Sequence, residues 1–156
     1  MRIKVKTLLI AIAIPLLVGG ASALLTMGDM EAFGMLNQPP LSPPAWLFPV
    51  AWTVLYCLMG VASYLVFEST ASAQTVASAL FPYLVQLLLN FAWPLFFFKL
   101  GAYWFSLVWL AALLALVVLV LVRFYRINKP AGLLILPYVL WLVFAAYLNA
   151  GVAYLN

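Results

Sequence analysis

Aromatic and amide side chains at helical spacing are the residues of this sequence that could do chemistry. One stretch places four of them at spacings of three, four and three residues, which is one face of a helix: Tyr83, Gln86, Asn90 and Trp93. Two other stretches carry similar stripes: Trp52, Tyr56, Gly60 and Ser63, and Tyr138, Trp141, Ala145, Leu148 and Asn149. The stripes could line a cavity for a flat apolar ligand, or they could pack and hydrogen-bond across helices. Periodicity alone favours the packing interpretation.

Acid–base, proton-transfer and metal chemistry lack the residues that they need. The sequence has seven basic residues, three acidic residues and no histidine, which removes the usual general base and the commonest metal or haem ligand. Its apolar runs contain no Asp, Glu, Lys or Arg of the kind that proton relays and ion pumps require at membrane depth. Cys57 is the one cysteine, which excludes an internal disulfide and a multi-cysteine metal site. We expect no metal and no resident cofactor.

The helices that must position these stripes follow from the charged residues, which divide the chain into five uncharged runs. The runs are 7–28, 32–67, 69–98, 100–122 and 130–156. A helix needs about 20 apolar residues to cross a membrane, because it rises about 1.5 Å per residue through about 30 Å of hydrocarbon. With 69% hydrophobic residues, the chain is predicted to be an all-α integral membrane protein. We expect one domain, residues 1–156, that is a bundle of five transmembrane helices over about 7–26, 46–67, 78–98, 102–122 and 131–154.

Basic residues predict how the bundle is oriented. Three precede the first span and three separate the fourth from the fifth, so both groups fall on one side of the membrane: Arg2, Lys4 and Lys6, and Arg123, Arg126 and Lys129. The positive-inside rule places the N-terminus in the cytoplasm and the C-terminus outside, in a membrane of the bacterial cytoplasmic type. Since these residues anchor the topology, the net charge of +4 indicates no nucleic-acid partner. Short connections after the second, third and fourth spans predict that consecutive helices are antiparallel neighbours.

The N-terminal segment allows a second interpretation. Basic residues 1–6, an apolar stretch and then Ala21-Ser22-Ala23 resemble a secretory signal with a small-residue cleavage site. The apolar stretch is long for a signal, which favours a retained first helix.

Prolines predict bent helices and a rigid first loop. Five of them lie inside or near the ends of spans, where each removes a backbone donor and tends to bend its helix: Pro15, Pro49, Pro82, Pro94 and Pro137. Bent helices can splay and leave a cavity. Residues 39–44 (PPLSPP) cannot be helical, so they form either a stiff cover at the mouth of the bundle or an ordinary rigid linker. The expected lid residues are Pro39, Pro43, Pro44 and Trp46.

Three blocks of the sequence resemble the TspO/MBR family, which comprises translocator proteins, tryptophan-rich sensory proteins and peripheral-type benzodiazepine receptors. The first block runs from Gln38 through the paired prolines and Trp52 to Met59-Gly60. The second is residues 89–94 (LNFAWP) with Phe96-Phe97, and the third runs from residues 137–141 (PYVLW) to Leu148-Asn149. The blocks stand in the order of the family, and the resemblance covers essentially the whole chain.

The resemblance implies a five-helix bundle, often a homodimer, with a pocket that opens toward the first loop. Family members bind porphyrins such as protoporphyrin IX, and synthetic isoquinoline carboxamide and benzodiazepine ligands. By motif position the ligand-binding residues are Trp52, Tyr56, Asn90, Trp93, Trp141, Ala145 and Leu148. Helical spacing groups the same residues, and this agreement favours a cavity over simple packing. The implied protein is a membrane receptor, sensor or carrier whose partners are a flat apolar small molecule and membrane lipid, with the porphyrin as ligand or substrate.

Two other functions stay open. Some bacterial relatives break down protoporphyrin IX in light and oxygen, and the tryptophans implicated there match Trp52 and Trp141, which makes these the candidate catalytic residues. A purely structural scaffold is the third possibility. The first loop departs from the family pattern, since Gln38 and Leu41 stand where Lys and Trp are usual, and Phe91 replaces a usual Trp in the second block. Without the loop Trp, the lid is expected to close less tightly.

Overall fold

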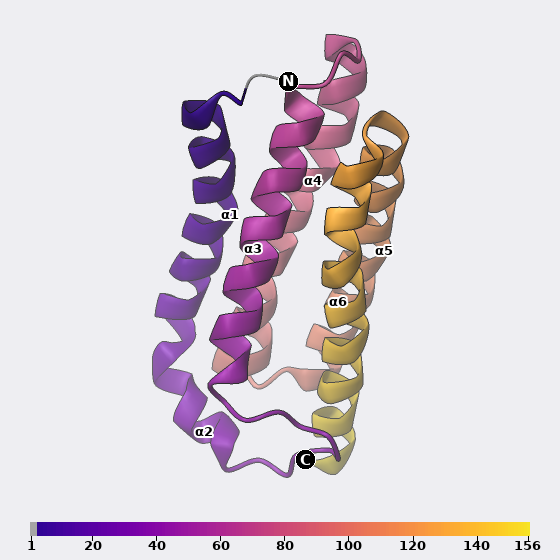
Figure 1. The fold of residues 1–156 in the computed structure, drawn as a ribbon. Helices are drawn as coiled ribbons and strands as arrows, with labels where there is room; N and C mark the ends of the chain where they lie inside the picture. Colours follow the sequence, from indigo (N-terminus) through magenta and orange to yellow (C-terminus); the bar gives the residue numbers. More distant parts are fainter. Residues whose placement is uncertain (1–2) are drawn as a thin grey trace.

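The computed structural model describes residues 3–156, and within that range all regular structure is helical (Figure 1). The elements are α1 (Val5–Thr26), the 3₁₀ turn η1 (Met27–Asp29), α2 (Met30–Gly34), α3 (Leu47–Phe67), α4 (Ala73–Pro94), the π-helical turn η2 (Leu95–Lys99), α5 (Tyr103–Ile127) and α6 (Lys129–Leu155). Figure 1 shows the five long helices side by side, with α2 at one end. All five are long and apolar enough to cross a membrane. The predicted all-α bundle of five transmembrane helices is confirmed.

The helices extend past the predicted spans at the end of the bundle that carries the basic clusters. Helix α4 begins at Ala73 because the Ser72 hydroxyl caps it and accepts a hydrogen bond from the Thr75 amide. Helix α5 continues through Arg123 and Arg126 to Ile127. Arginine can keep its charged head in water while its stem covers apolar surface, so a charge ends the hydrocarbon span without ending the helix.

The five long helices form a ring in the order α1, α3, α6, α5, α4. Helix α1 packs against both α3 and α4, which close the ring on that side. A Cβ atom on Gly60 would lie 2.4 Å from the Cα atom of Ile12, so α1 and α3 touch backbone to backbone. The prediction that consecutive helices are neighbours holds for α4–α5 and α5–α6. It is wrong for α3 and α4, which approach each other less closely than either approaches α1, although side-chain contacts of Gln86 and Asn90 connect them.

Apolar side chains fill the interior and also cover the outer surface. Met59 and Leu142 are fully buried in the core, whereas Leu17, Phe81 and Val108 are each about 70% exposed. An outer surface of this kind is suited to lipid and not to water. Ser22, which belongs to the small-residue motif of the alternative signal interpretation, is buried and donates a hydrogen bond to the Phe91 carbonyl oxygen at 2.9 Å. These are the contacts of a helix that belongs to the bundle.

Candidate ligand-binding site

Trp52 lies at the centre of an aromatic cluster inside the bundle. Its ring stacks on Tyr56 with a centroid distance of 5.5 Å and an interplanar angle of 27°. It meets Tyr138 and Trp141 edge to face, at 6.1 and 6.3 Å. Both arrangements suit the charge distribution of aromatic rings. The stripes of α3 and α6 therefore face each other, as their spacing predicts.

Buried amides join this cluster to α4. Asn90 Nδ2 donates a hydrogen bond to the Tyr56 hydroxyl at 3.3 Å. The Tyr138 hydroxyl donates to Gln86 Oε1 at 2.9 Å, and Gln86 Nε2 lies 3.8 Å from the Met59 sulfur atom. Both amides are almost fully buried, so these partners satisfy polar groups that lipid could not. For the amides, the packing interpretation describes what the side chains do.

A second polar centre surrounds Asn149 near the other end of α6. Its Oδ1 accepts a hydrogen bond from Trp93 Nε1 at 3.2 Å and lies 3.0 Å from the Ser106 hydroxyl. Its Nδ2 donates to the Tyr103 carbonyl oxygen at 2.9 Å. One amide thus connects α4, α5 and α6.

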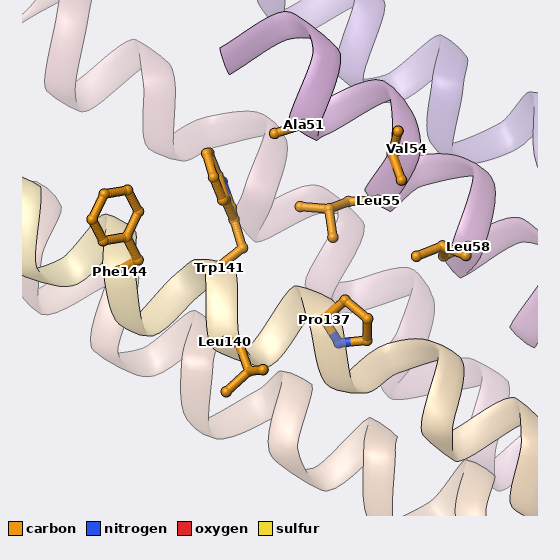
Figure 2. A pocket seen from close by; sticks show the side chains of 8 residues that line it. All are labelled: Ala51, Val54, Leu55, Leu58, Pro137, Leu140, Trp141 and Phe144. Atoms are coloured by element: carbon orange, nitrogen blue, oxygen red, sulfur yellow. The ribbon is translucent and has the colours of Figure 1, made fainter. Parts of the chain in front are cut away.

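An open groove of about 470 Å³ runs along the outer side of the α3–α6 contact. Its lining is apolar: Ala51, Val54, Leu55, Leu58, Pro137, Leu140, Trp141 and Phe144. Figure 2 shows Trp141 projecting from α6 toward Ala51 of α3, with Phe144 one turn further along α6. Of the seven predicted ligand-binding residues, Trp141 is the one that lines the groove. Since Trp141 also contacts Trp52, its indole separates the groove from the interior cluster.

The other predicted residues lie behind this groove. Trp52, Tyr56 and Asn90 form the interior cluster, and Trp93 belongs to the Asn149 centre. The side chains of Ala145 and Leu148 are half-buried on α6. The structure thus places most of the predicted set in two groups of contacting side chains, one around Trp52 and one around Asn149. It also adds a lipid-facing groove that the sequence did not predict.

Comparison with known proteins agrees with this architecture. Residues 11–155 match the TspO/MBR family. The chain belongs to this family. It is 34% identical to the tryptophan-rich protein TspO of Chlorobaculum tepidum over 157 residues, which cover 100% of this chain and 99% of that one. It is also 33% identical to the tryptophan-rich sensory protein of Cereibacter sphaeroides (81% and 77% covered) and 32% identical to the translocator protein of Bos taurus (87% and 82% covered).

Family membership and the five apolar helices together establish a multi-pass integral membrane protein. The resemblance inferred from the three sequence blocks is thereby confirmed. The tryptophan and amide stripes belong to the matched region.

The first loop of this TspO/MBR protein crosses the end of the bundle and rests on α6 (Figure 1). Pro39 is buried against Gly151, where an added Cβ atom would lie 2.5 Å from the proline Cβ. The Tyr147 hydroxyl donates a hydrogen bond to the Pro40 carbonyl oxygen at 2.7 Å. The proline-rich segment therefore covers one end of the bundle, in the place expected of a lid.

The loop is fastened a second time at the end of α6. The backbone N–H of Asn37 donates to Asn156 Oδ1, and Asn156 Nδ2 donates to the backbone carbonyl oxygen of Asn37, both at 3.0 Å. The remaining lid residues are held less firmly: Pro43 is half-buried, Pro44 is exposed, and Trp46 is 65% exposed. Leu41, which replaces the usual loop Trp, has a φ of 68° and points into solvent.

Sequence reasoning missed the contribution of α5 to the Asn149 centre. Tyr103 supplies a backbone carbonyl, which no side-chain pattern reports. Ser106 supplies a hydroxyl and is completely buried. The available signal was Ser106 itself, a serine among apolar residues, because a transmembrane serine usually needs a hydrogen-bond partner on a neighbouring helix.

Proposed function

We propose that this protein is a membrane receptor, sensor or carrier for a flat tetrapyrrole of the protoporphyrin IX type, and that it also accepts isoquinoline carboxamide and benzodiazepine ligands. The observation that carries the proposal is the position of Trp141, which lines the α3–α6 groove and contacts Trp52 of the aromatic interior. The relatives named tryptophan-rich sensory protein and translocator protein support it.

The groove suits such a ligand in size and chemistry. Its volume of about 470 Å³ lies within the range of about 300–1,000 Å³ that small-molecule sites span. A planar ring that enters the groove would stack on the Trp141 indole. To reach Asn90, the ring must displace Trp141 from Trp52. The Trp141 indole would then act as a gate between the membrane and the interior.

A free-base porphyrin fits better than haem. The sequence has no histidine to bind iron. The anionic propionates would point to the loop end of the groove, where Phe48 packs on Trp141 at 6.1 Å. At that end of the bundle the cationic residue is Lys99, with Asp29 and Glu31, so the propionates would stay in water or meet amide and indole donors.

A dark titration of the detergent-purified protein with protoporphyrin IX tests the proposal. Quenching of tryptophan fluorescence should saturate near micromolar porphyrin, and Trp141→Ala should weaken binding about tenfold because a large stacking surface is lost. Trp104→Ala is the matched control, since Trp104 is 61% exposed on α5 and lines neither the groove nor the cluster. Linear quenching that both variants leave unchanged would mean that the porphyrin merely partitions into the micelle, and would favour the scaffold alternative.

The Trp52–Trp141 contact also favours a second candidate function, the light- and oxygen-dependent breakdown of the bound porphyrin. Electron exchange between an excited porphyrin and an indole requires contact but no acid or base. Illumination should then bleach the porphyrin absorption band in the wild type and not in Trp141→Phe. Bleaching at the same rate by free porphyrin in detergent would remove this candidate.

We propose the orientation in which the N-terminus faces the cytoplasm, in a membrane of the bacterial cytoplasmic type. Support comes from one end of the bundle, which carries Lys4, Lys6, Arg123, Arg126 and Lys129 (Figure 1). Reporter fusions after Asn156 test it. A phosphatase that needs an extracytoplasmic location should be active there, and a fusion active only in the cytoplasm would reverse the orientation.

A further inference from the structure

A second pocket lies on the opposite side of the ring from the groove, between the first turns of α4 and the last turns of α5. Its volume is about 310 Å³, and it shares no lining residue with the groove. The lining is Thr75, Ser78, Ala79, Arg123, Arg126 and Ile127. The pocket lies at the end of the bundle where α4 begins and α5 ends, which Figure 1 shows beside the α5–α6 connection.

Two guanidinium groups give this pocket its chemistry. Arg123 Nη1 donates a hydrogen bond to the Ser78 carbonyl oxygen, which holds that side chain across the pocket from α5 to α4. Arg126, three residues further along α5, is exposed and also lines the pocket. A guanidinium carries five N–H donors in a planar fork that matches the oxygens of a phosphate. Thr75 and Ser78 line the same wall, where the Ser78 hydroxyl donates to the Thr75 carbonyl oxygen and the Thr75 hydroxyl pairs with that of Ser72.

No carboxylate neutralises these arginines. The sequence contains three acidic residues, and Asp29 and Glu31 lie at the opposite end of the bundle. Glu68 lies at the same end as the pocket but pairs with Lys4, with 2.8 Å between Nζ and Oε2. Among residues 3–156 this is the one salt bridge, so the pocket presents two uncompensated positive charges. That charge is complementary to an anion.

Apolar surface continues from the pocket along both helices toward the middle of the bundle. On α5, Leu119 and Val122 precede Arg126 by seven and four residues, which places them on its face, and both side chains are exposed. On α4, Phe81 follows Ser78 by three residues and is 70% exposed. An anion that also carries acyl chains can therefore bind with its phosphate between the arginines and its chains along this surface. Basic pockets between transmembrane helices bind anionic headgroups in this manner.

We propose that this pocket binds the phosphate of an anionic phospholipid from the leaflet at this end of the bundle. Arg123 and Arg126 hold the phosphate oxygens, and Thr75 and Ser78 form the α4 wall of the site. The two arginines thus do more than set the orientation of the chain. The same phosphate chemistry could be offered by a soluble anion, and the apolar surface next to the pocket assigns it to a lipid.

Native mass spectrometry of the full chain, released from detergent micelles, tests this proposal. The protein is titrated with dioleoylphosphatidylglycerol and, separately, with dioleoylphosphatidylcholine. The wild type should bind phosphatidylglycerol in preference, and the double variant Arg123→Gln/Arg126→Gln should weaken that binding about tenfold, because charge-assisted hydrogen bonds to the phosphate are lost. Lys129→Gln is the matched control, because it removes one charge at the same end from an exposed residue that does not line the pocket.

Three results would overturn the proposal. The first is equal loss of phosphatidylglycerol binding in Lys129→Gln and in the single variant Arg126→Gln, which would show a diffuse charge effect. Arg126 is exposed and donates no hydrogen bond to the protein in the described structure, so this single variant keeps the test valid if the double variant misfolds. The second is unchanged binding in the double variant. The third is displacement of the lipid by inorganic phosphate at equal concentration, which would make the site one for a soluble anion.

Discussion

The Trp93 indole and the Asn149 amide are joined by a hydrogen bond of 3.2 Å from Nε1 to Oδ1, which links α4 to α6 inside the bundle. Asn149 is 1% exposed, and its Nδ2 donates to the carbonyl oxygen of Tyr103, the first residue of α5. A single side chain therefore fixes the relative positions of three helices near the end that the first loop covers.

Replacing Asn149 by alanine should lower the free energy of unfolding in mixed SDS micelles by about 2–3 kcal/mol, because it removes the hydrogen bonds of one amide to α4 and α5 and leaves the part-buried Trp93 indole N–H unpaired. Ser106→Ala removes one contact to the same amide and should lower it by about 1 kcal/mol. Equal effects of the two substitutions would show that Asn149 is not the shared partner of the three helices.

Gly60→Ala should destabilise the bundle by about 1–3 kcal/mol, because the new methyl group would overlap the backbone of α1 at Ile12. Gly20→Ala is the matched control, since no atom lies within 4 Å of the position of its Cβ. That variant should be unchanged or stabilised by about 0.5–1 kcal/mol, as for Gly→Ala elsewhere in helices. Equal thermal stability of the two variants would contradict the close packing of α1 on α3.

Leu41→Gly should stabilise the protein by about 0.5–1 kcal/mol, because a left-handed conformation strains a leucine and not a glycine. The φ of Leu41 is 68° and its side chain is 83% exposed, so little packing is lost. Leu36→Gly in the same loop should destabilise instead, since Leu36 is half-buried and its φ is negative. Thermal unfolding of the two variants checks this, and a loss of stability in both would mean that Leu41 is not strained.

The Lys4–Glu68 pair predicts how stability depends on pH in the alkaline range. A hydrogen bond from Lys4 to Glu68, together with the charge of Glu68, raises the pKa of Lys4 above its usual 10.5. The stabilisation is therefore complete below the pKa of the unfolded lysine and disappears as the pH rises through the raised value. The melting temperature should differ between wild type and Glu68→Gln by a constant amount from neutral pH to about pH 10 and converge above it. A difference that persists undiminished at higher pH would exclude this pair as its source.

The helices and their inward faces could be predicted because two simple signals report them. Lipid excludes charge, so the uncharged runs locate the spans, and a period of 3.6 residues aligns Gln86 with Asn90 on one face. The order of the helices in the ring had no such signal. That order depends on how closely the backbones of α1 and α3 approach at Gly60. A glycine in a transmembrane sequence predicts close packing but does not show which helix packs against it.

The residues of the candidate site could be predicted from the sequence, but the position of the groove beside them could not. Helical spacing placed Trp52 and Trp141 on facing stripes, and they do meet. Spacing could not show that the Trp141 indole also lines the groove on the lipid side. A large side chain near the edge of a helix face can contact the interior and the outer surface at the same time. The partners of Asn149 on α5 were missed because one of them is a backbone atom.

The loop that covers the bundle is fastened to residues that the ribosome makes much later than the loop itself. Asn37 and its partner Asn156 are 119 residues apart in the chain, so at about 5–20 residues per second roughly 6–24 s of synthesis separate them. During that interval the segment around Pro39 lacks Gly151, against which it packs in the folded protein. Biogenesis of this protein therefore passes through a stage in which this end of the bundle is uncovered, and the loop can be fastened only after the last turns of α6 have been made.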